Sequence, residues 1–318
     1  MEEDMKLEMA ADDNRQLNQL EIARIIGEPK DPRRPFSSLV EAVCETDSAE
    51  PEDYTYYFDV LQDTDKIYVI TSTGAVTQEN VTPDTPALLT FVDIATPEYY
   101  FKFTDLAKKK EQVIARKLVT INRALNAYEN YKVISLIDGA VQSGNTYTLD
   151  SGKTRFDFPK LIDMIDGVVD YGDNYTLIMG STINKDITLW DWNDNKYHSL
   201  KQAFADLNVD TVRVGAAQTV NIDGSPTSVL SSTVAYLVAK DTEVGKPLLF
   251  VRKKLDTLKM LGGVIAQDGG APERLVLSSP NPITVTGTAR YLAYGVIGFE
   301  EVATAVVNPY TLAKFTRS

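Results

Sequence analysis

The stretch TDLAKKKEQVIARKLVTINRALNAYENYKVISLIDGAVQ, residues 104–142, predicts one unusually long helix, which is the clearest indication of the fold. Its apolar residues step by four, three, four and three positions, which aligns them in one stripe along a helix. At 1.5 Å per residue, an unbroken helix of this length spans roughly 55 Å. Gly144 and Asn145 end the pattern, and Lys108–Lys110 lie on its first turns. The stripe consists of Ile114, Leu118, Ile121, Leu125 and Tyr128.

Before this helix, residues 54–95 predict a long β-hairpin with a polar tip. Both sides of the hairpin are rich in aromatic and β-branched residues, which favour strands, whereas the intervening Ser72–Pro86 is polar. A hairpin of this length has no core of its own, so we expect it to lie on a neighbouring molecule. Thr96-Pro97-Glu98 follows and predicts a helix start, with a capping hydroxyl and a proline in the first turn.

Residues 1–50 predict an arm that packs little against its own chain. An acidic start leads into a short helix near Leu17–Ile26, and three prolines in Gly27–Pro35 favour an extended segment. A short apolar helix is predicted around Phe36–Cys44. The acidic start lacks the basic and apolar regions of a secretory signal.

Residues 146–270 predict a compact α/β block, and the chain then returns to β structure. A helix is expected at Phe158–Tyr171, and Ser199-Leu-Lys-Gln202 is a capping box that opens a helix through Leu207. The tail Tyr310–Phe315 is short. The predicted strands are Tyr175–Gly180, Val209–Val214, Val229–Ala239, Pro247–Val251, Ile283–Thr286, Ala289–Val296 and Gly298–Val307.

Composition excludes several classes of function. The net charge is −13, from 45 acidic and 32 basic side chains, whereas nucleic-acid binders usually carry a basic surface. A single cysteine and a single histidine leave no internal disulfide, no ordinary zinc site and few routes to nucleophilic catalysis. The apolar stretch Ile283–Val307 is interrupted by charges, so the sequence predicts a soluble protein made in a cytoplasm.

Each candidate site has a plainer alternative. Asp191–Asn195 alternates carboxylates and amides like a calcium loop but lacks the required glycine and terminal glutamate, which favours a polar turn. His198 is interpreted as a surface residue before a helix cap, and Cys44 as a buried structural thiol. Lys108–Lys110 is interpreted as a solvated helix face or as a patch that pairs with acidic residues of a neighbour. The glycine pairs Gly262-Gly263 and Gly269-Gly270 lack a phosphate-binding context, no cofactor is expected, and a carboxylate pair for glycoside hydrolysis stays open.

The order of parts resembles the HK97-like major capsid proteins of tailed bacteriophages, and the resemblance covers most of the chain. It implies an α+β fold with an N-terminal arm at 1–53 and an extended loop at 54–96. A peripheral domain with the long spine helix is implied at 97–153 and 275–318, and an axial α/β domain at 154–274. The segment Arg290–Pro309 resembles the closing β segment of the peripheral sheet.

The resemblance implies a structural, non-enzymatic subunit that forms hexamers and pentamers of an icosahedral head shell around double-stranded DNA. Portal and scaffolding or decoration proteins are the implied partners, the virion is the implied location, and membrane partners are not expected. An encapsulin-like compartment shell is the alternative, and a hydrolase using His198 is less favoured. The expected contacts with an adjacent subunit lie in the hairpin tip, at Ser72, Thr73, Gly74, Gln78, Glu79, Thr82, Pro83 and Asp84.

Overall fold

The computed structural model describes residues 38–58, 87–97, 99–190, 199–215, 218–222, 225–241, 245–255, 274–279 and 293–317. The chain divides into two units, which we describe separately. Unit 1 takes its residues after the arm from 93–128 and 255–301, and unit 2 comprises 37–92, 129–254 and 302–318. Helix α3 (Phe103–Ala140) and strand β14 (Ala293–Val306) contribute residues to both units. The predicted division into arm, extended loop, peripheral domain and axial domain stays a prediction.

The long helix is confirmed, because α3 runs for 38 residues, from one residue before the predicted start to two residues before the predicted end. In its first part, which belongs to unit 1, Ile121 and Leu125 are buried as the stripe predicts, and Tyr128 is half-buried. The side chains of Ile114 and Leu118 lie outside the described ones.

In unit 1, α3 packs against strand β14. A Cβ atom added to Gly298 would lie 2.4 Å from Cγ2 of Ile121, so only glycine allows this close approach of strand and helix. Strand β14 pairs antiparallel with β5 (Tyr99–Lys102) through residues 293–296 and with β13 (Arg274–Ser279) through residues 295–300. Strand β4 (Val92–Ala95) also pairs with β14.

The predicted helix start at Thr96 is wrong. Thr96 exchanges hydrogen bonds with Gly298: its N–H donates to the Gly298 carbonyl at 2.8 Å, and its hydroxyl accepts from the Gly298 N–H at 2.8 Å. The hydroxyl that would cap a helix is therefore used to join β14. Strand β5 follows, and the helix starts only at Phe103.

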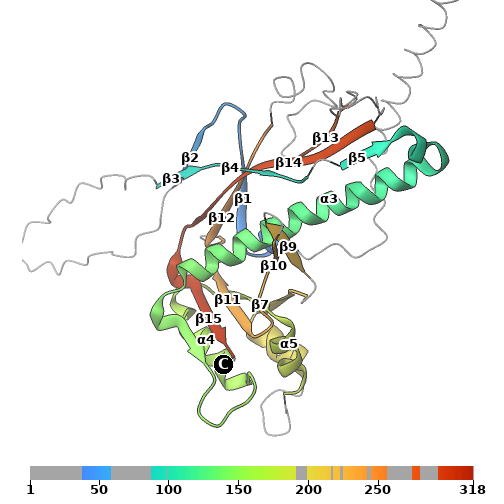
Figure 1. Ribbon diagram of the computed structural model, residues 1–318. Coiled ribbons are helices and arrows are strands. Elements are labelled where there is room, and N and C mark those ends of the chain that lie inside the picture. Colours follow the sequence, from blue (N-terminus) through green and yellow to red (C-terminus); the bar gives the residue numbers. More distant parts are fainter. Residues whose placement is uncertain are drawn as a thin grey trace, which may run out of the picture. The chain divides into compact units, whose positions relative to one another are not determined.

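Unit 2 is built on a five-stranded sheet in the order β6-β15-β11-β7-β8. The two outer pairs are parallel and the inner ones antiparallel, and Figure 1 shows β15, β11 and β7 side by side. Strands β7 and β11 are apolar on both faces and almost entirely buried, as expected of central strands covered on both sides. The bounds are β6 Thr146–Thr148, β7 Asn174–Met179, β8 Val209–Arg213, β11 Val234–Lys240 and β15 Leu312–Thr316.

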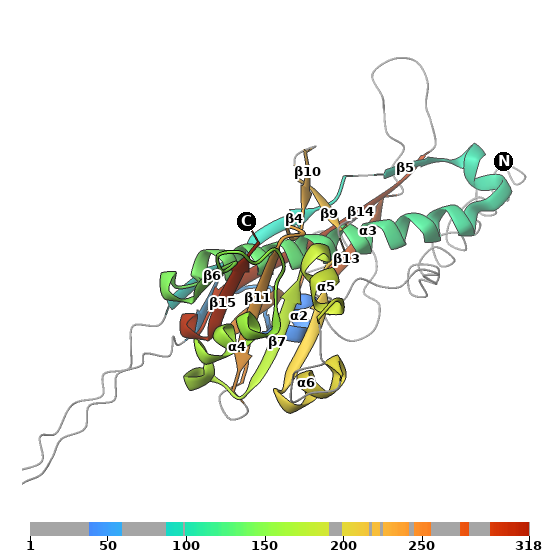
Figure 2. The ribbon, with the colours of Figure 1, turned by 90° about the horizontal axis from the view of Figure 1, so that it is seen from below.

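Helices and aromatic rings close one core of unit 2. Phe156 lies at its centre, with its ring centroid 4.6 Å from that of Phe315 and 5.8 Å from that of Trp190. The Trp190 indole N–H donates to the Phe156 carbonyl at 2.7 Å. Figure 2 shows α5 and α6 beside β7. The helical segments are α4 Phe158–Asp166, α5 Ser181–Thr188 and α6 Leu200–Asp206, with 3-10 turns at Ser143–Asn145, Val169–Tyr171 and Pro309–Thr311.

A second part of unit 2 joins the N-terminal described residues to the chain's last third. Strand β1 pairs parallel with β12, and β12 pairs antiparallel with residues 302–306 of β14. Helix α2 starts where the Leu39 N–H donates to the Asn130 side chain of α3 at 3.0 Å. The remaining elements are α2 Leu39–Val43, β1 Cys44–Ala49, β2 Thr55–Phe58, β3 Ala87–Thr90, β9 Thr219–Ile222, β10 Ser225–Ser228 and β12 Leu248–Lys253.

Several predicted elements change at their ends. The helix predicted to run to Tyr171 stops at Asp166, because Gly167 caps it and a 3-10 turn follows. The predicted tail Tyr310–Phe315 contains a sheet strand, β15, and two predicted late strands are one, β14. The Ser199 cap of the predicted capping box is confirmed, since its hydroxyl accepts from the Gln202 N–H at 3.3 Å. The strand predicted at Ile283–Thr286 lies outside the described residues.

Candidate assembly surface

The base of the predicted hairpin is confirmed and has two different faces. Strands β2 and β3 pair antiparallel over four residues, with Tyr56 opposite Leu89 and Thr55 opposite Thr90. Because successive side chains of a strand alternate between faces, Tyr56 and Leu89 share one face, and Leu88 lies on the other. The first face is packed on the chain itself, and the second is not.

The packed face rests on the β1–β12–β14 sheet of unit 2. Tyr56, Leu89 and Phe91 pack against a buried cluster formed by Ala49, Leu249, Val251, Ala303 and Ala305. The Tyr56 hydroxyl donates a hydrogen bond to Asp47, and this bond, with burial, raises the pKa of Tyr56 to about 12. The expectation that the hairpin finds no support on its own chain is therefore wrong at its base.

Large apolar groups at the base of the hairpin remain in solvent. Tyr54 is 84% exposed, Leu88 54% and Val92 44%, and these three residues fall in or next to β2, β3 and β4. The Lys253 ammonium lies 5.3 Å from the Tyr54 ring centroid and 5.6 Å from that of Phe91. Burying such side chains contributes about 1.5–3 kcal/mol each, so this surface has apolar area left for a partner.

The predicted contact residues of the hairpin tip fall outside the described part of the chain. All eight predicted contact residues, Ser72 to Asp84, lie between Phe58 and Ala87 and outside the described residues. The same holds for His198, for the Asp191–Asn195 turn and for both glycine pairs. Lys108–Lys110 belong to α3, but their side chains are not among the described ones. These interpretations stay predictions.

Cys44 is a buried structural thiol, as predicted. Its side chain has no exposed surface, and burial raises the pKa of the thiol to about 12, so it is not a thiolate near neutral pH. Within the described ranges, no group of three or more His, Cys, Asp and Glu side chains is placed to hold a metal ion. None of the helices in the described part of the chain is long and apolar enough to span a membrane.

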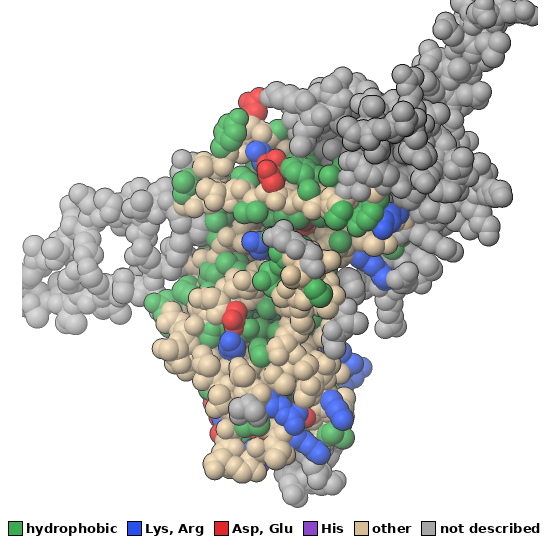
Figure 3. Space-filling view, in the orientation of Figure 1, with side chains coloured by type: hydrophobic (Ala, Val, Ile, Leu, Met, Phe, Trp, Pro, Cys, Tyr) green, Lys and Arg blue, Asp and Glu red, His purple; other side chains and the backbone are tan. Residues whose placement is uncertain are grey.

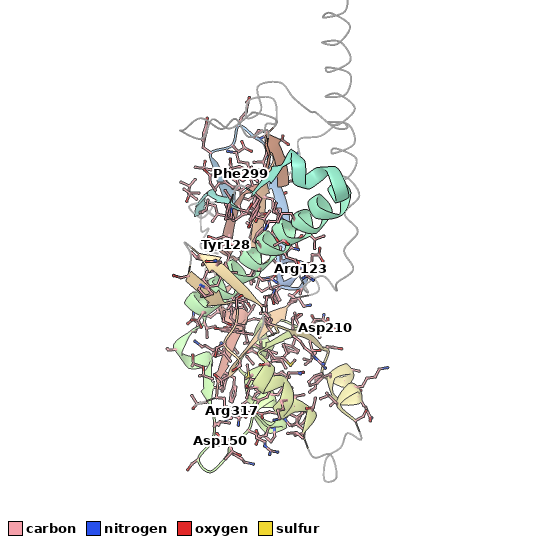
Figure 4. All side chains as sticks on the ribbon, turned by 45° about the vertical axis from the view of Figure 1, so that its right-hand side comes forward. Arg123, Tyr128, Asp150, Asp210, Phe299 and Arg317 are labelled. Carbon is pink, nitrogen blue, oxygen red and sulfur yellow. The ribbon has the colours of Figure 1, made fainter. Side chains whose placement is uncertain are left out.

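Sequence reasoning missed the buried ion pairs that hold unit 2 together. Arg252 of β12 donates to Glu129 of α3 through Nε and Nη2, both at 2.9 Å. Arg317, after β15, donates to both oxygens of Asp186 at 2.9 Å, and the Phe156 N–H donates to the same carboxylate at 3.1 Å. These pairs join positions more than 100 residues apart, so no local pattern could have indicated them. In Figure 4, the label Arg317 marks the end of the chain near α5.

The fold matches solved capsid structures over almost the whole chain. The capsid of cyanophage P-SCSP1u is similar with a TM-score of 0.56 and 10% identity, covering 91% of this chain and 90% of that one. The mature capsid of bacteriophage PhiM1 gives a TM-score of 0.55 and 12% identity, covering 92% and 90%. A structure of mycobacterium phage Adephagia gives 0.57 and 11%, covering 91% and 92%.

The chain has the HK97-like capsid fold. The structural matches confirm the predicted fold class. No family model and no curated protein matches the sequence, so this confirmation rests on structure alone. Among the described residues of this HK97-like fold, three of the six exposed large apolar side chains lie at the base of the hairpin, and none lies in a strand of the five-stranded sheet.

Proposed function

We propose that this protein is the major capsid subunit of a tailed bacteriophage, which self-assembles into an icosahedral head shell around double-stranded DNA. The observation that carries the proposal is an HK97-like fold over about nine tenths of the chain, combined with unburied apolar groups beside the hairpin. A subunit that must bind several copies of itself leaves such surface exposed until assembly covers it.

In this proposal the hairpin tip, Ser72 to Asp84, contacts an adjacent subunit, and the copies form hexamers and pentamers. Portal and scaffolding or decoration proteins are its partners, the virion is its location, and assembly takes place in the host cytoplasm. DNA is enclosed without sequence-specific binding, which agrees with a net charge of −13. The subunit has no catalytic role.

The exposed side chain of Leu88 offers a direct test. Leu88→Glu should abolish particles, because a carboxylate cannot be buried in the contact without a partner, whereas Leu88→Ile keeps the apolar surface and should assemble. Sedimentation velocity and electron microscopy measure assembly, and circular dichroism of dissociated subunits should be the same for both variants.

Two results would count against the proposal: wild-type protein that stays monomeric at high concentration, or Leu88→Glu particles like those of Leu88→Ile. Regular shells that enclose a host protein and no DNA would favour the encapsulin-like alternative.

A further inference from the structure

A cleft of about 500 Å³ opens in unit 2 between α5, α6 and strand β8. Its floor is apolar and buried, and consists of Met179, Ile187, Phe204 and Val209. Its rim is polar and includes Asn184, Lys201, Thr211 and Arg213. An apolar floor with polar groups at the edge is the usual form of a binding site.

The rim carries positive charge that the described residues do not neutralise. Lys201 and Arg213 are exposed and have no carboxylate partner among the described residues. Asp210, the acidic residue of the lining, lies 3.8 Å from the Lys240 ammonium. Figure 4 labels Asp210 on the side of unit 2 that carries α6. Figure 3 shows Lys and Arg side chains gathered on one face of unit 2, although the whole chain is acidic.

Strand β8 also offers backbone groups. It is the last strand of the order β6-β15-β11-β7-β8 and pairs only with β7 among the described residues. In a parallel pair, alternate residues of the outer strand direct their N–H and C=O groups away from the sheet. An extended segment lying along β8 could therefore bond to the strand while its side chains reach the cleft.

We propose that this cleft binds the acidic N-terminal segment, residues 1–13, of a second copy of the chain. The inference rests on the proposed function, because shell assembly is what brings a second copy close. Six of these thirteen residues are acidic and one is a lysine, and apolar side chains alternate with the charges. Acids match Lys201 and Arg213, and the apolar side chains match the floor. The apolar residues in question are Met1, Met5, Leu7 and Met9.

The length of the chain before Ser38 and the side chains of residues 1–13 both favour this segment as the occupant of the cleft. The 37 residues before Ser38 can span roughly 120 Å when fully extended, which is enough to reach a neighbouring molecule. Nucleic acid would also satisfy the two cations, but its phosphates gain nothing from an apolar floor. An acidic peptide with methionine and leucine side chains uses both parts of the cleft.

Disulfide trapping tests the contact between two copies. Because Cys44 is buried, Glu8→Cys on one tagged chain and Thr211→Cys on a co-expressed chain supply the reactive thiols. We expect a disulfide-linked dimer of the two chains. Thr154→Cys is the matched control, since Thr154 is exposed in the same unit but does not line the cleft. Equal cross-linking at Thr154, or no cross-link at Thr211 in assembled particles, would overturn the inference.

A binding measurement decides the same question without shells. A fluorescent peptide of residues 1–13 is titrated into full-length protein in which Glu2, Glu3 and Asp4 are changed to amides. Lys201→Glu with Arg213→Glu should weaken binding about tenfold or more, whereas the matched pair Lys153→Glu with Arg155→Glu should leave it within about twofold.

Different results would reject the capsid function and the cleft contact. If particles form but the cross-link is absent and the peptide does not bind, the cleft contact is rejected and the proposed capsid function is unaffected. Displacement of the peptide by short single-stranded DNA as effectively as by unlabelled peptide would indicate a phosphate site and overturn the inference. Peptide binding by a protein that never forms particles would reject the capsid function and the second copy with it.

Discussion

The five-stranded sheet of unit 2 and the β2–β3 ribbon are both β structure, yet they obtain their stability differently. In the sheet, β7 and β11 are buried on both faces, and the last strand, β15, completes the core with a fully buried Phe315. In the ribbon, one face packs on the chain, while Leu88 on the other face and the adjacent Tyr54 remain mostly exposed.

The difference separates folding from assembly. Side chains that are buried within the subunit should change the free energy of unfolding when they are altered. Side chains that the subunit leaves exposed should change assembly and leave unfolding unaffected. Measurements on dissociated subunits can therefore test whether the two regions differ in this way.

The largest effect is expected in the sheet. Phe315→Ala removes a ring that packs against Phe156, and it should lower the free energy of unfolding by about 3–5 kcal/mol in urea denaturation. Tyr54→Ala removes a ring that is mostly in solvent, and it should change the same quantity by less than about 0.5 kcal/mol. Similar losses for both variants would contradict the separation.

The next effect concerns the ion pair that fixes the end of β15. Arg317→Met leaves the buried Asp186 carboxylate without its cation, and should cost about 2–3 kcal/mol of unfolding free energy. Lys160→Met is the control, because Lys160 pairs with two half-exposed acids, Asp150 and Asp163, and should cost less than about 1 kcal/mol. An equal cost for the two changes would show that burial of the pair is unimportant.

Two glycine substitutions compare a tightly packed position in unit 1 with an open position on α3. Gly298→Ala places a methyl group against Ile121 and should cost about 1–3 kcal/mol. Gly139→Ala, on α3, meets nothing within 4 Å and should stabilise the helix by about 0.5–1 kcal/mol. Thermal unfolding of the two variants should shift in opposite directions, and a neutral Gly298→Ala would argue against the close contact.

The smallest effect depends on pH. Burial tends to raise the pKa of the Asp138 carboxyl, but hydrogen bonds from Lys314 and Tyr236 outweigh it and hold the pKa below the ordinary value of 3.8. Because the pKa is lower in the folded state, the carboxylate stabilises the fold above about pH 4, and this contribution is lost as the pH falls through the lowered pKa. Asp138 is half-exposed, so the contribution should stay below about 1 kcal/mol.

Urea titrations at pH 7 and pH 3 measure this contribution. Asp138→Asn should lose less stability between the two pH values than the wild type. A larger loss for the variant would contradict the assigned direction.

Local patterns predicted the parts of the fold that depend on local chemistry. The apolar stripe of α3 and the Ser199 cap are properties of neighbouring residues, and both were predicted correctly. Helix α5 was missed because Ser181, Thr182, Asn184 and Thr188 are weak helix formers, and its position depends on packing of Ile183 and Ile187 into the core.

Long-range pairing was not predictable from the sequence. Strand β15 looked like a tail because its partners, β11 and β6, lie about 80 and 170 residues earlier in the chain. Thr96 has the sequence of a helix cap, but Gly298, 202 residues away, takes its hydroxyl. The candidate cleft is likewise lined by α5, α6 and β8, and no residue spacing in the sequence indicates it.

On the proposed function, the exposed apolar groups at the base of the hairpin become covered when copies assemble. Thiol labelling of Leu88→Cys measures this directly, because the native Cys44 is buried and contributes no signal. We expect rapid labelling of dissociated subunits and labelling at least about tenfold slower in purified particles. Equal labelling rates in subunits and particles would contradict it.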